Sequence, residues 1–236
     1  MSRIKTELRS TARCLGIIRL LLPLRACIYR MRGNDGYEAK FAKAVQQAVA
    51  PGDVVWDIGA NLGLYTKVFL DLAGPQCKII AFEPAPACFA AMQETFKDVP
   101  NVQLMNMAIG NEAGTVDMNL AMNPKGATHS LVSAASDETV AVAIASSDDI
   151  VAQGLAPVPN VIKIDVEGFE YEVLLGMTHL LRNRTVREVL VEIHFKLLEI
   201  KGDKHAPTQM VNMLTAEGFD VNWTDSSHIH ARRPKG

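Results

Sequence analysis

The chain has 236 residues, of which 48% are hydrophobic, with 24 basic and 26 acidic side chains and a formal net charge of −2. This length suits one α/β domain with or without an appendage, and the apolar content excludes a disordered chain. The charge does not favour a nucleic-acid-binding protein, which needs a basic surplus. Its four cysteines show no C-x-x-C spacing and no disulfide framework, so we expect a reducing, cytoplasmic location.

Residues 1–36 are predicted to form a basic amphipathic helical arm, separate from a domain at 37–236. Up to Asp35 the arm carries eight basic and two acidic side chains. Its longest apolar stretch is interrupted by Arg19 and Pro23 and is too short to span a membrane. Two interpretations stay open: the arm packs on its own domain or on a second subunit, or it lies on an anionic membrane surface. The second would make the protein peripherally membrane-associated.

From residue 37 onward, strand and helix patterns alternate along the chain. Strands are predicted at 54–58, 78–82, 102–105, 139–145, 161–165 and 189–193, with an edge strand at 115–122 and short strands near Val221 and Ile229. Helices are predicted at 64–73, 87–97, 171–181 and 208–217, and a long loop at 123–138. This order predicts an α/β fold with a single doubly wound, mostly parallel sheet, and a ligand at the carboxyl ends of its strands.

The loop after the first strand, D-I-G-A-N-L-G at 57–63, is bounded by glycines that permit a sharp turn and close approach to a ligand. It does not match the G-x-G-x-x-G fingerprint of dinucleotide-binding proteins. The carboxylate of Asp57 suits a ligand with an ammonium group, and Glu83, at the end of the second strand, suits ribose hydroxyls. A ribose, an adenine and an amino-acid tail together describe S-adenosylmethionine (SAM). The alternative is a tight turn with a helix-capping acid.

Three segments in order and spacing resemble the FkbM family of SAM-dependent methyltransferases: V-W-D-I-G-A-N-L-G at 55–63, F-E-P at 82–84, and I-K-I-D-V-E-G-F-E at 162–170 with V-L-x-G at 173–176. The resemblance spans about 53–219, and the third segment is its most specific part. One departure is Ser147-Asp148, where relatives usually have Leu-Asp, which we interpret as a surface difference. The resemblance implies a class I fold and O-methylation of hydroxyls on sugars, glycolipids or natural products, with S-adenosylhomocysteine as the second product.

The resemblance also implies the cofactor contacts. Asp57 would hold the amino group directly or through water, and a backbone cradle would be formed by Gly59, Asn61 and Gly63. Glu83 would bind the ribose, and the adenine would be flanked by Pro84, Met107 and Ala108.

Methyl transfer is an in-line displacement that needs positioning, and a hydroxyl acceptor also needs a base. Strand alternation and the shared carboxyl edge predict that Asp165, Glu167 and His194 gather near the methyl group. We expect His194 or Asp165 to act as the base and Glu167 to orient the acceptor. The same three residues offer an oxygen and nitrogen set for a divalent cation, but the spacing does not specify one, so no metal is predicted.

Several plainer interpretations accompany these. Lys163 is expected to form a structural pair with Glu192, and His194 is equally compatible with a core position. His129 and Ser130, in the long loop, either meet the acceptor or are solvated. The remaining histidines are expected at surface or helix-end positions: His179, His205, His228 and His230.

Three further function classes stay open. They are an N-methyltransferase acting on a small molecule, a nucleotide-binding oxidoreductase, and a non-catalytic SAM-binding partner of a glycan-assembly complex. The oxidoreductase would need the tighter glycine pattern that is missing here. The expected partners are therefore a small-molecule or glycan acceptor and no nucleic acid.

Overall fold

The computed structural model describes residues 37–119 and 139–234. The predicted arm at 1–36 and the predicted loop at 123–138, with His129 and Ser130, lie outside the described residues. Both interpretations of the arm therefore stay predictions. Within the described ranges, no helix is long and apolar enough to cross a membrane.

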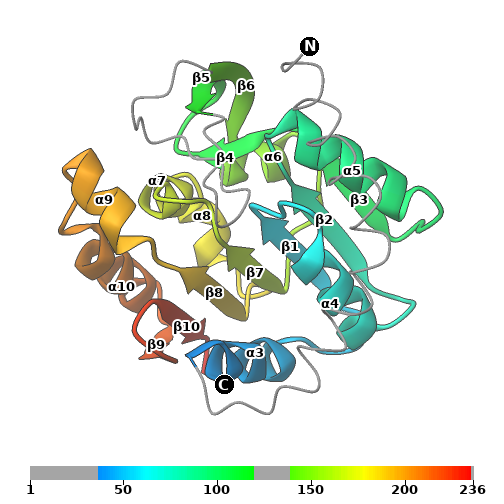
Figure 1. Cartoon of the computed structure of the whole chain (residues 1–236). Coiled ribbons are helices and arrows are strands. Elements are labelled where there is room, and N and C mark those ends of the chain that lie inside the picture. The colour runs from blue at the N-terminus through cyan, green and yellow to red at the C-terminus, as the bar shows by residue number, and fades with distance from the viewer. Residues whose placement is uncertain (1–36, 120–138, 235–236) are drawn as a thin grey trace.

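A seven-stranded sheet forms the centre of the domain, in the order β3-β2-β1-β7-β8-β10-β9 (Figure 1). The five neighbouring strands β3, β2, β1, β7 and β8 run parallel, whereas β10 is antiparallel to both of its neighbours. Their bounds are β1 Val54–Ile58, β2 Lys78–Phe82, β3 Val102–Met105, β7 Val161–Ile164, β8 Glu188–Glu192, β9 Asp220–Trp223 and β10 His228–Arg232. The predicted fold class is confirmed.

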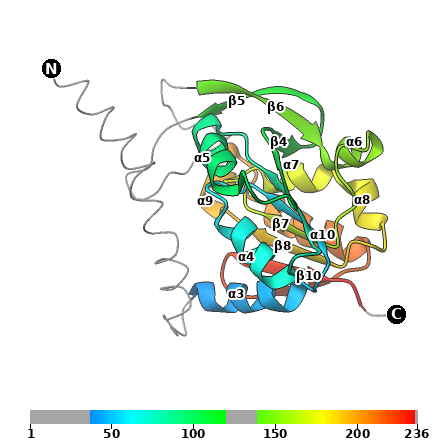
Figure 2. The ribbon, with the colours of Figure 1, turned by 90° about the vertical axis from the view of Figure 1, so that its right-hand side faces the viewer.

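Helices cover both faces of this sheet. On one face, α3 (Tyr37–Ala48) and α4 (Leu64–Ala73) pack against Val55 and Ile79, and α5 (Pro86–Phe96) packs against Ala81. On the other face, α6 (Ser147–Ala152), α7 (Glu170–Leu175), α8 (Thr178–Arg182) and α10 (Ala206–Ala216) pack against Trp56 and Ile162 (Figure 2). The inner strands are apolar on both sides because both faces are buried.

The strand order places a topological switch point between β1 and β7. From β1 the chain turns through α4 to β2 on one side, whereas β7, reached later, pairs with the other side of β1. Asp57 is in register with Lys163, and Ile58 with Ile164. The loops that leave the carboxyl ends of β1, β2 and β7 therefore meet at one edge, where such sheets bind ligands.

Three strands form a second sheet, which adds to the single sheet that we predicted. Its order is β4-β6-β5, with β4 Ala108–Gly110, β5 Gly114–Asn119 and β6 Thr139–Ser146. Ala108 and Met118 of this sheet pack with Ala85 and Cys88 at the start of α5. The small sheet thus covers the same edge of the large sheet at which the β1 and β2 loops emerge (Figure 1).

The predicted helix at 171–181 is broken into α7 and α8 at Gly176. A Cβ atom on Gly176 would lie 1.8 Å from the carbonyl oxygen of Gly110, so the close contact with β4 requires glycine here. The sequence patterns did not predict four elements: the helices α3, α6 and α9 (Phe195–Lys201) and the strand β4.

Candidate functional site

The loop after β1 turns through three residues with left-handed backbone conformations. The φ angles of Gly59, Asn61 and Gly63 are 78°, 52° and 77°. A Cβ atom on Gly59 would lie 1.8 Å from the carbonyl oxygen of Asp165, so glycine lets the β1 loop touch the end of β7. A Cβ atom on Gly63 would lie 2.4 Å from the ring of Phe96. The spacing of the two glycines is thus explained by two separate close contacts.

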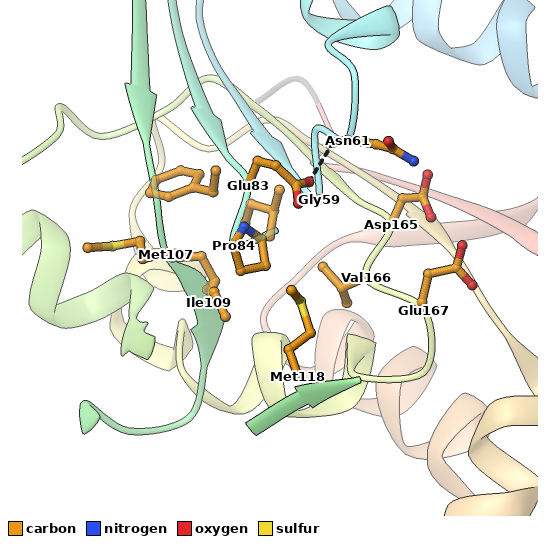
Figure 3. A pocket seen from close by; sticks show the side chains of 13 residues that line it. Gly59, Asn61, Glu83, Pro84, Met107, Ile109, Met118, Asp165, Val166 and Glu167 are labelled. Atoms are coloured by element: carbon orange, nitrogen blue, oxygen red, sulfur yellow. Dashed lines mark hydrogen bonds between the residues drawn. The ribbon is translucent and has the colours of Figure 1, made fainter. Parts of the chain in front are cut away.

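Glu83 ties the β1 loop to the end of β2. Its Oε2 accepts a hydrogen bond from the backbone N–H of Asn61 at 2.7 Å, and its Oε1 accepts one from Ala85 at 2.8 Å (Figure 3). Burial, opposed by these two hydrogen bonds, raises the pKa of Glu83 to about 7. The carboxylate is therefore fixed in place and only partly ionised at neutral pH. It lines the pocket described below.

Asp57 lies behind the loop, in contact with α4 and β7. Its Oδ2 accepts a hydrogen bond from Thr66 at 2.7 Å, and its Oδ1 lies 3.3 Å from Nζ of Lys163. The same ammonium group lies 3.2 Å from Oδ2 of Asp165. Burial alone would lower the pKa of Lys163, but the two carboxylates outweigh it and raise that pKa. The predicted pair of Lys163 with Glu192 is wrong, because the partners of Lys163 are Asp57 and Asp165.

A pocket opens at the carboxyl ends of β1, β2 and β7 (Figure 3). Of the residues predicted to hold the cofactor or to act in catalysis, those that line it are Gly59, Asn61, Glu83, Pro84, Met107, Ala108, Asp165 and Glu167. Its lining does not include Asp57, Gly63 or His194, so a contact of Asp57 with an amino group stays a prediction. The pocket has five further lining residues that were not predicted: Ile58, Phe82, Ile109, Met118 and Val166.

Met118 shows why part of the pocket could not be predicted. It lies on β5, in the second sheet, and is 1% exposed. Figure 3 shows its side chain beside the pocket, across from Pro84. The alternation of residues 114–119 indicates which face is apolar, but it does not indicate that this face covers the end of the large sheet.

His194 follows β8 and lies among carboxylates. Its Nε2 is 3.2 Å from Oε2 of Glu167 and 3.8 Å from Oδ1 of Asp165. Its Nδ1 is 2.7 Å from Oε1 of the fully buried Glu170. Burial by itself lowers the pKa of His194, but Glu170, Glu167 and Asp165 outweigh it and raise that pKa to about 9. The structure brings Asp165, Glu167 and His194 together as strand alternation led us to expect, and their chemical roles stay predictions.

Glu167 combines two unusual features. Its backbone φ angle is 53°, in a region that residues other than glycine seldom adopt. Such backbone conformations cluster at functional sites. Burial raises the pKa of its carboxyl group, although His194 opposes the shift. The turn between β7 and α7 that carries Glu167 places its Oε2 3.2 Å from Nε2 of His194.

Glu192 and His228 extend this group of charged residues toward β10. Oε2 of Glu192 lies 3.3 Å from Nε2 of His228, whose Nδ1 lies 2.8 Å from Oδ1 of Asp225. Burial by itself lowers the pKa of His228, but these two carboxylates raise it overall. The ring also stacks on Phe41 at 4.1 Å between centroids.

The predicted surface positions of His228 and His230 are wrong, because both lie buried on β10. His230 lies 2.6 Å from Glu188. His179 and His205 lie at the expected places, because His179 is exposed on the short helix α8 and His205 lies at the start of α10.

Comparisons with known proteins give a consistent result. A family model described as "Methyltransferase FkbM domain" matches residues 57–221. The hexuronic acid methyltransferase AglP of Haloferax volcanii is 30% identical over 168 residues, which cover 71% of this chain and 66% of that protein. The 31-O-demethyl-FK506 methyltransferase FkbM of Streptomyces tacrolimicus is 30% identical over 235 residues, covering 79% of this chain and 83% of that protein.

The fold has a counterpart among solved structures. The crystal structure of methyltransferase FkbM from Methylobacillus flagellatus superposes with a TM-score of 0.54 at 12% identity, covering 92% of this chain and 60% of that one. This chain therefore spans slightly less than two thirds of both the Haloferax relative and the solved structure.

Proposed function

We propose that this chain, which belongs to the FkbM family, is a SAM-dependent methyltransferase whose acceptor is a hydroxyl group of a sugar, a glycan, a glycolipid or a natural product. One observation carries the proposal. A single pocket is lined by Glu83 at the end of β2 and by Asp165 and Glu167 after β7 (Figure 3). A ribose hydrogen-bonded to Glu83 would place the rest of the cofactor across Gly59, so that its methyl group points toward the two acids.

The chemistry asks little of the protein beyond position. The acceptor oxygen attacks the methyl carbon as the carbon–sulfur bond breaks, and the electron pair returns to sulfur, which leaves S-adenosylhomocysteine. The hydroxyl proton passes to a neighbouring base. Of the two bases predicted from the sequence, position favours Asp165, because it lines the pocket and His194 does not. Lys163 holds Oδ2 of Asp165 and leaves Oδ1 on the side of His194.

The names of the two relatives support an oxygen acceptor on a sugar or a natural product. One acts on a hexuronic acid and the other on 31-O-demethyl-FK506. The chain also offers an apolar surface at the same edge of the sheet. Phe195, directly after His194, stacks with Trp223 at 6.0 Å, and the two are 45% and 46% exposed. An aromatic pair of this kind provides a surface for the apolar face of an acceptor.

Calorimetric titration of SAM and of S-adenosylhomocysteine into the wild type and Glu83→Ala tests the cofactor site. We expect binding that weakens by about tenfold or more in the variant, because the hydrogen bonds of Glu83 to the ribose are lost. Glu112→Ala, which removes an exposed acid on a turn outside the pocket lining, is the matched control. No binding of either ligand by the folded wild type would overturn the proposal.

The acceptor is then sought by transfer of a labelled methyl group from SAM to a panel of sugars, uronic acids and polyketides. An alkali-stable product is expected, because a methyl ether survives base. An alkali-labile methyl ester, or a product methylated on nitrogen, would contradict O-methylation of a hydroxyl. SAM binding without transfer to any acceptor, unchanged in Asp165→Ala and His194→Ala, would favour the non-catalytic alternative.

A further inference from the structure

We propose that Asp165, Glu167 and His194 hold a divalent cation beside the cofactor pocket. One donor atom from each lies within 4.8 Å of the others. Nε2 of His194 is already 3.2 Å from Glu167 and 3.8 Å from Asp165. Two ligands at right angles on an ion with bonds of about 2.1 Å lie about 3 Å apart, so small side-chain movements complete the set.

The donors are oriented by residues around them. The buried Glu170 binds Nδ1 of His194, which leaves Nε2 to face the two acids. A carboxylate on the second ring nitrogen is the usual support of a metal-binding histidine, because it fixes the tautomer and the ring orientation. Lys163 takes Oδ2 of Asp165, and Oδ1 faces His194.

The charge around His194 supplies a second argument. One imidazole faces four carboxylates, those of Asp165, Glu167, Glu170 and Glu192, at distances from 2.7 to 4.0 Å. Glu170 is fully buried, and its Oε2 has no hydrogen-bond partner among the described residues. Negative charge in such a place is costly unless a cation offsets it. Lys163 faces Asp165 and His228 faces Glu192, so a protonated His194 brings the nearby positive charges to three against these four carboxylates. A divalent cation on Nε2 would supply two positive charges in place of the imidazole's one.

The two carboxylates suit ions such as Mn²⁺ and Mg²⁺, and the imidazole adds one nitrogen ligand. Three protein ligands leave positions for water or an acceptor oxygen. The cation's role in catalysis rests on the proposed function, although its binding does not. Because Asp165 and Glu167 also line the pocket, the ion would contact the acceptor oxygen next to the methyl group and lower the pKa of the hydroxyl. Water could then take the proton, because Asp165, with one oxygen on Lys163 and the other on the ion, would no longer serve as the base.

Binding is measured on the full chain after EDTA treatment and its removal, without SAM. Mn²⁺ is titrated while electron paramagnetic resonance reports the free ion, and Mg²⁺ is then added as a competitor. We expect one Mn²⁺ per chain, displaced by Mg²⁺. Binding should weaken at least tenfold in Asp165→Asn, Glu167→Gln and His194→Gln. In His179→Gln it should stay unchanged, because that exposed histidine faces only Asp148.

Circular dichroism establishes that each variant is folded. Glu167→Gln is the variant of choice if the others unfold, because Asp165 and His194 also pair with the buried Lys163 and Glu170. A free-ion signal that never falls, or equal binding by wild type and folded Glu167→Gln, would overturn the cation site. SAM binding and methyl transfer at full rate in EDTA would then leave the proposed function intact. Mn²⁺ binding with no SAM binding would support the cation site and overturn the proposed function.

Discussion

Lys163 and Asp57 form a buried ion pair at the register where β7 meets β1, with 3.3 Å between Nζ and Oδ1. The exposed fractions of their side chains are 2% and 0%. Because Asp165 shares the same ammonium group, one cation offsets two carboxylates at the point where the two halves of the sheet diverge. The pair is therefore a structural element of the site rather than part of the pocket lining.

Removing this cation should destabilise the fold strongly. Lys163→Met leaves Asp57 buried without its charged partner, and such a loss costs about 3–5 kcal/mol. The free energy of unfolding in urea measures the effect. Lys97→Met, which breaks an exposed pair with Glu94, is the control and should cost less than about 1 kcal/mol. Equal stability of the two variants would contradict the structural importance of Lys163.

The pH dependence of SAM binding should show the titration of Glu83. Its pKa is about 7, so the carboxylate gains a proton below that pH and becomes a weaker acceptor for ribose hydroxyls. The dissociation constant should rise by roughly tenfold between pH 8 and pH 6. The amino group of SAM titrates nearby, so Glu83→Gln serves as the reference and should lack the step that Glu83 contributes. Parallel pH profiles for the two proteins would exclude Glu83 from the ribose site.

Most of the large sheet could be predicted from local patterns. The strands at 54–58, 78–82 and 102–105 and the helix at 64–73 match the predicted bounds, because turn residues such as Gly, Pro and Asn flank these apolar runs. The elements β4 and α6 are too short to show a hydrophobic period in the sequence. Alternation placed Lys163 on a face, but β7 lies between β1 and β8, so the pattern alone did not decide between Asp57 and Glu192.

The site was predictable where it follows parallel strands and was missed elsewhere. Residues at the ends of β1, β2 and β7 meet because parallel strands end at one edge. His228 lies opposite Glu192 in the antiparallel pairing of β10 with β8. This register depends on the turn between β9 and β10. Met118 depends on how the second sheet docks. The hydrophobic period of the local sequence predicts neither the contact of His228 nor the position of Met118.

Alanine at Gly59 should disrupt the site more than alanine at other glycines with positive φ. Gly59 and Gly154 have φ angles of 78° and 69°, so both substitutions strain the backbone by about 1 kcal/mol. A Cβ atom on Gly154 meets nothing within 4 Å, whereas one on Gly59 collides with the backbone of Asp165. Gly59→Ala should therefore lose SAM binding and several kcal/mol of stability. Similar unfolding curves for both variants would contradict the close contact.

His228 should make stability depend on pH in a defined direction. Its pKa is raised in the folded state, so its contribution is complete below the unfolded value of about 6.5 and is lost as pH rises through the folded value. The stability difference between wild type and His228→Gln should shrink as the pH rises above neutrality. Urea unfolding from pH 5.5 to 9 measures it. A difference that grows with pH would mean that His228 is buried in its neutral form.

The exposed aromatic pair predicts a separation of acceptor binding from cofactor binding. Trp223→Ala removes one ring of the stacked pair with Phe195, and neither residue lines the pocket. The KM for the acceptor should rise by roughly tenfold, the cost of losing about 1.5 kcal/mol of aromatic contact. The dissociation constant of SAM should stay unchanged. Leu155→Ala, at an exposed apolar residue far along the chain from His194, is the control and should change neither value. An unchanged KM for Trp223→Ala would show that the acceptor approaches from another side, whereas weakened SAM binding would mean that the substitution disturbs the fold of the pocket.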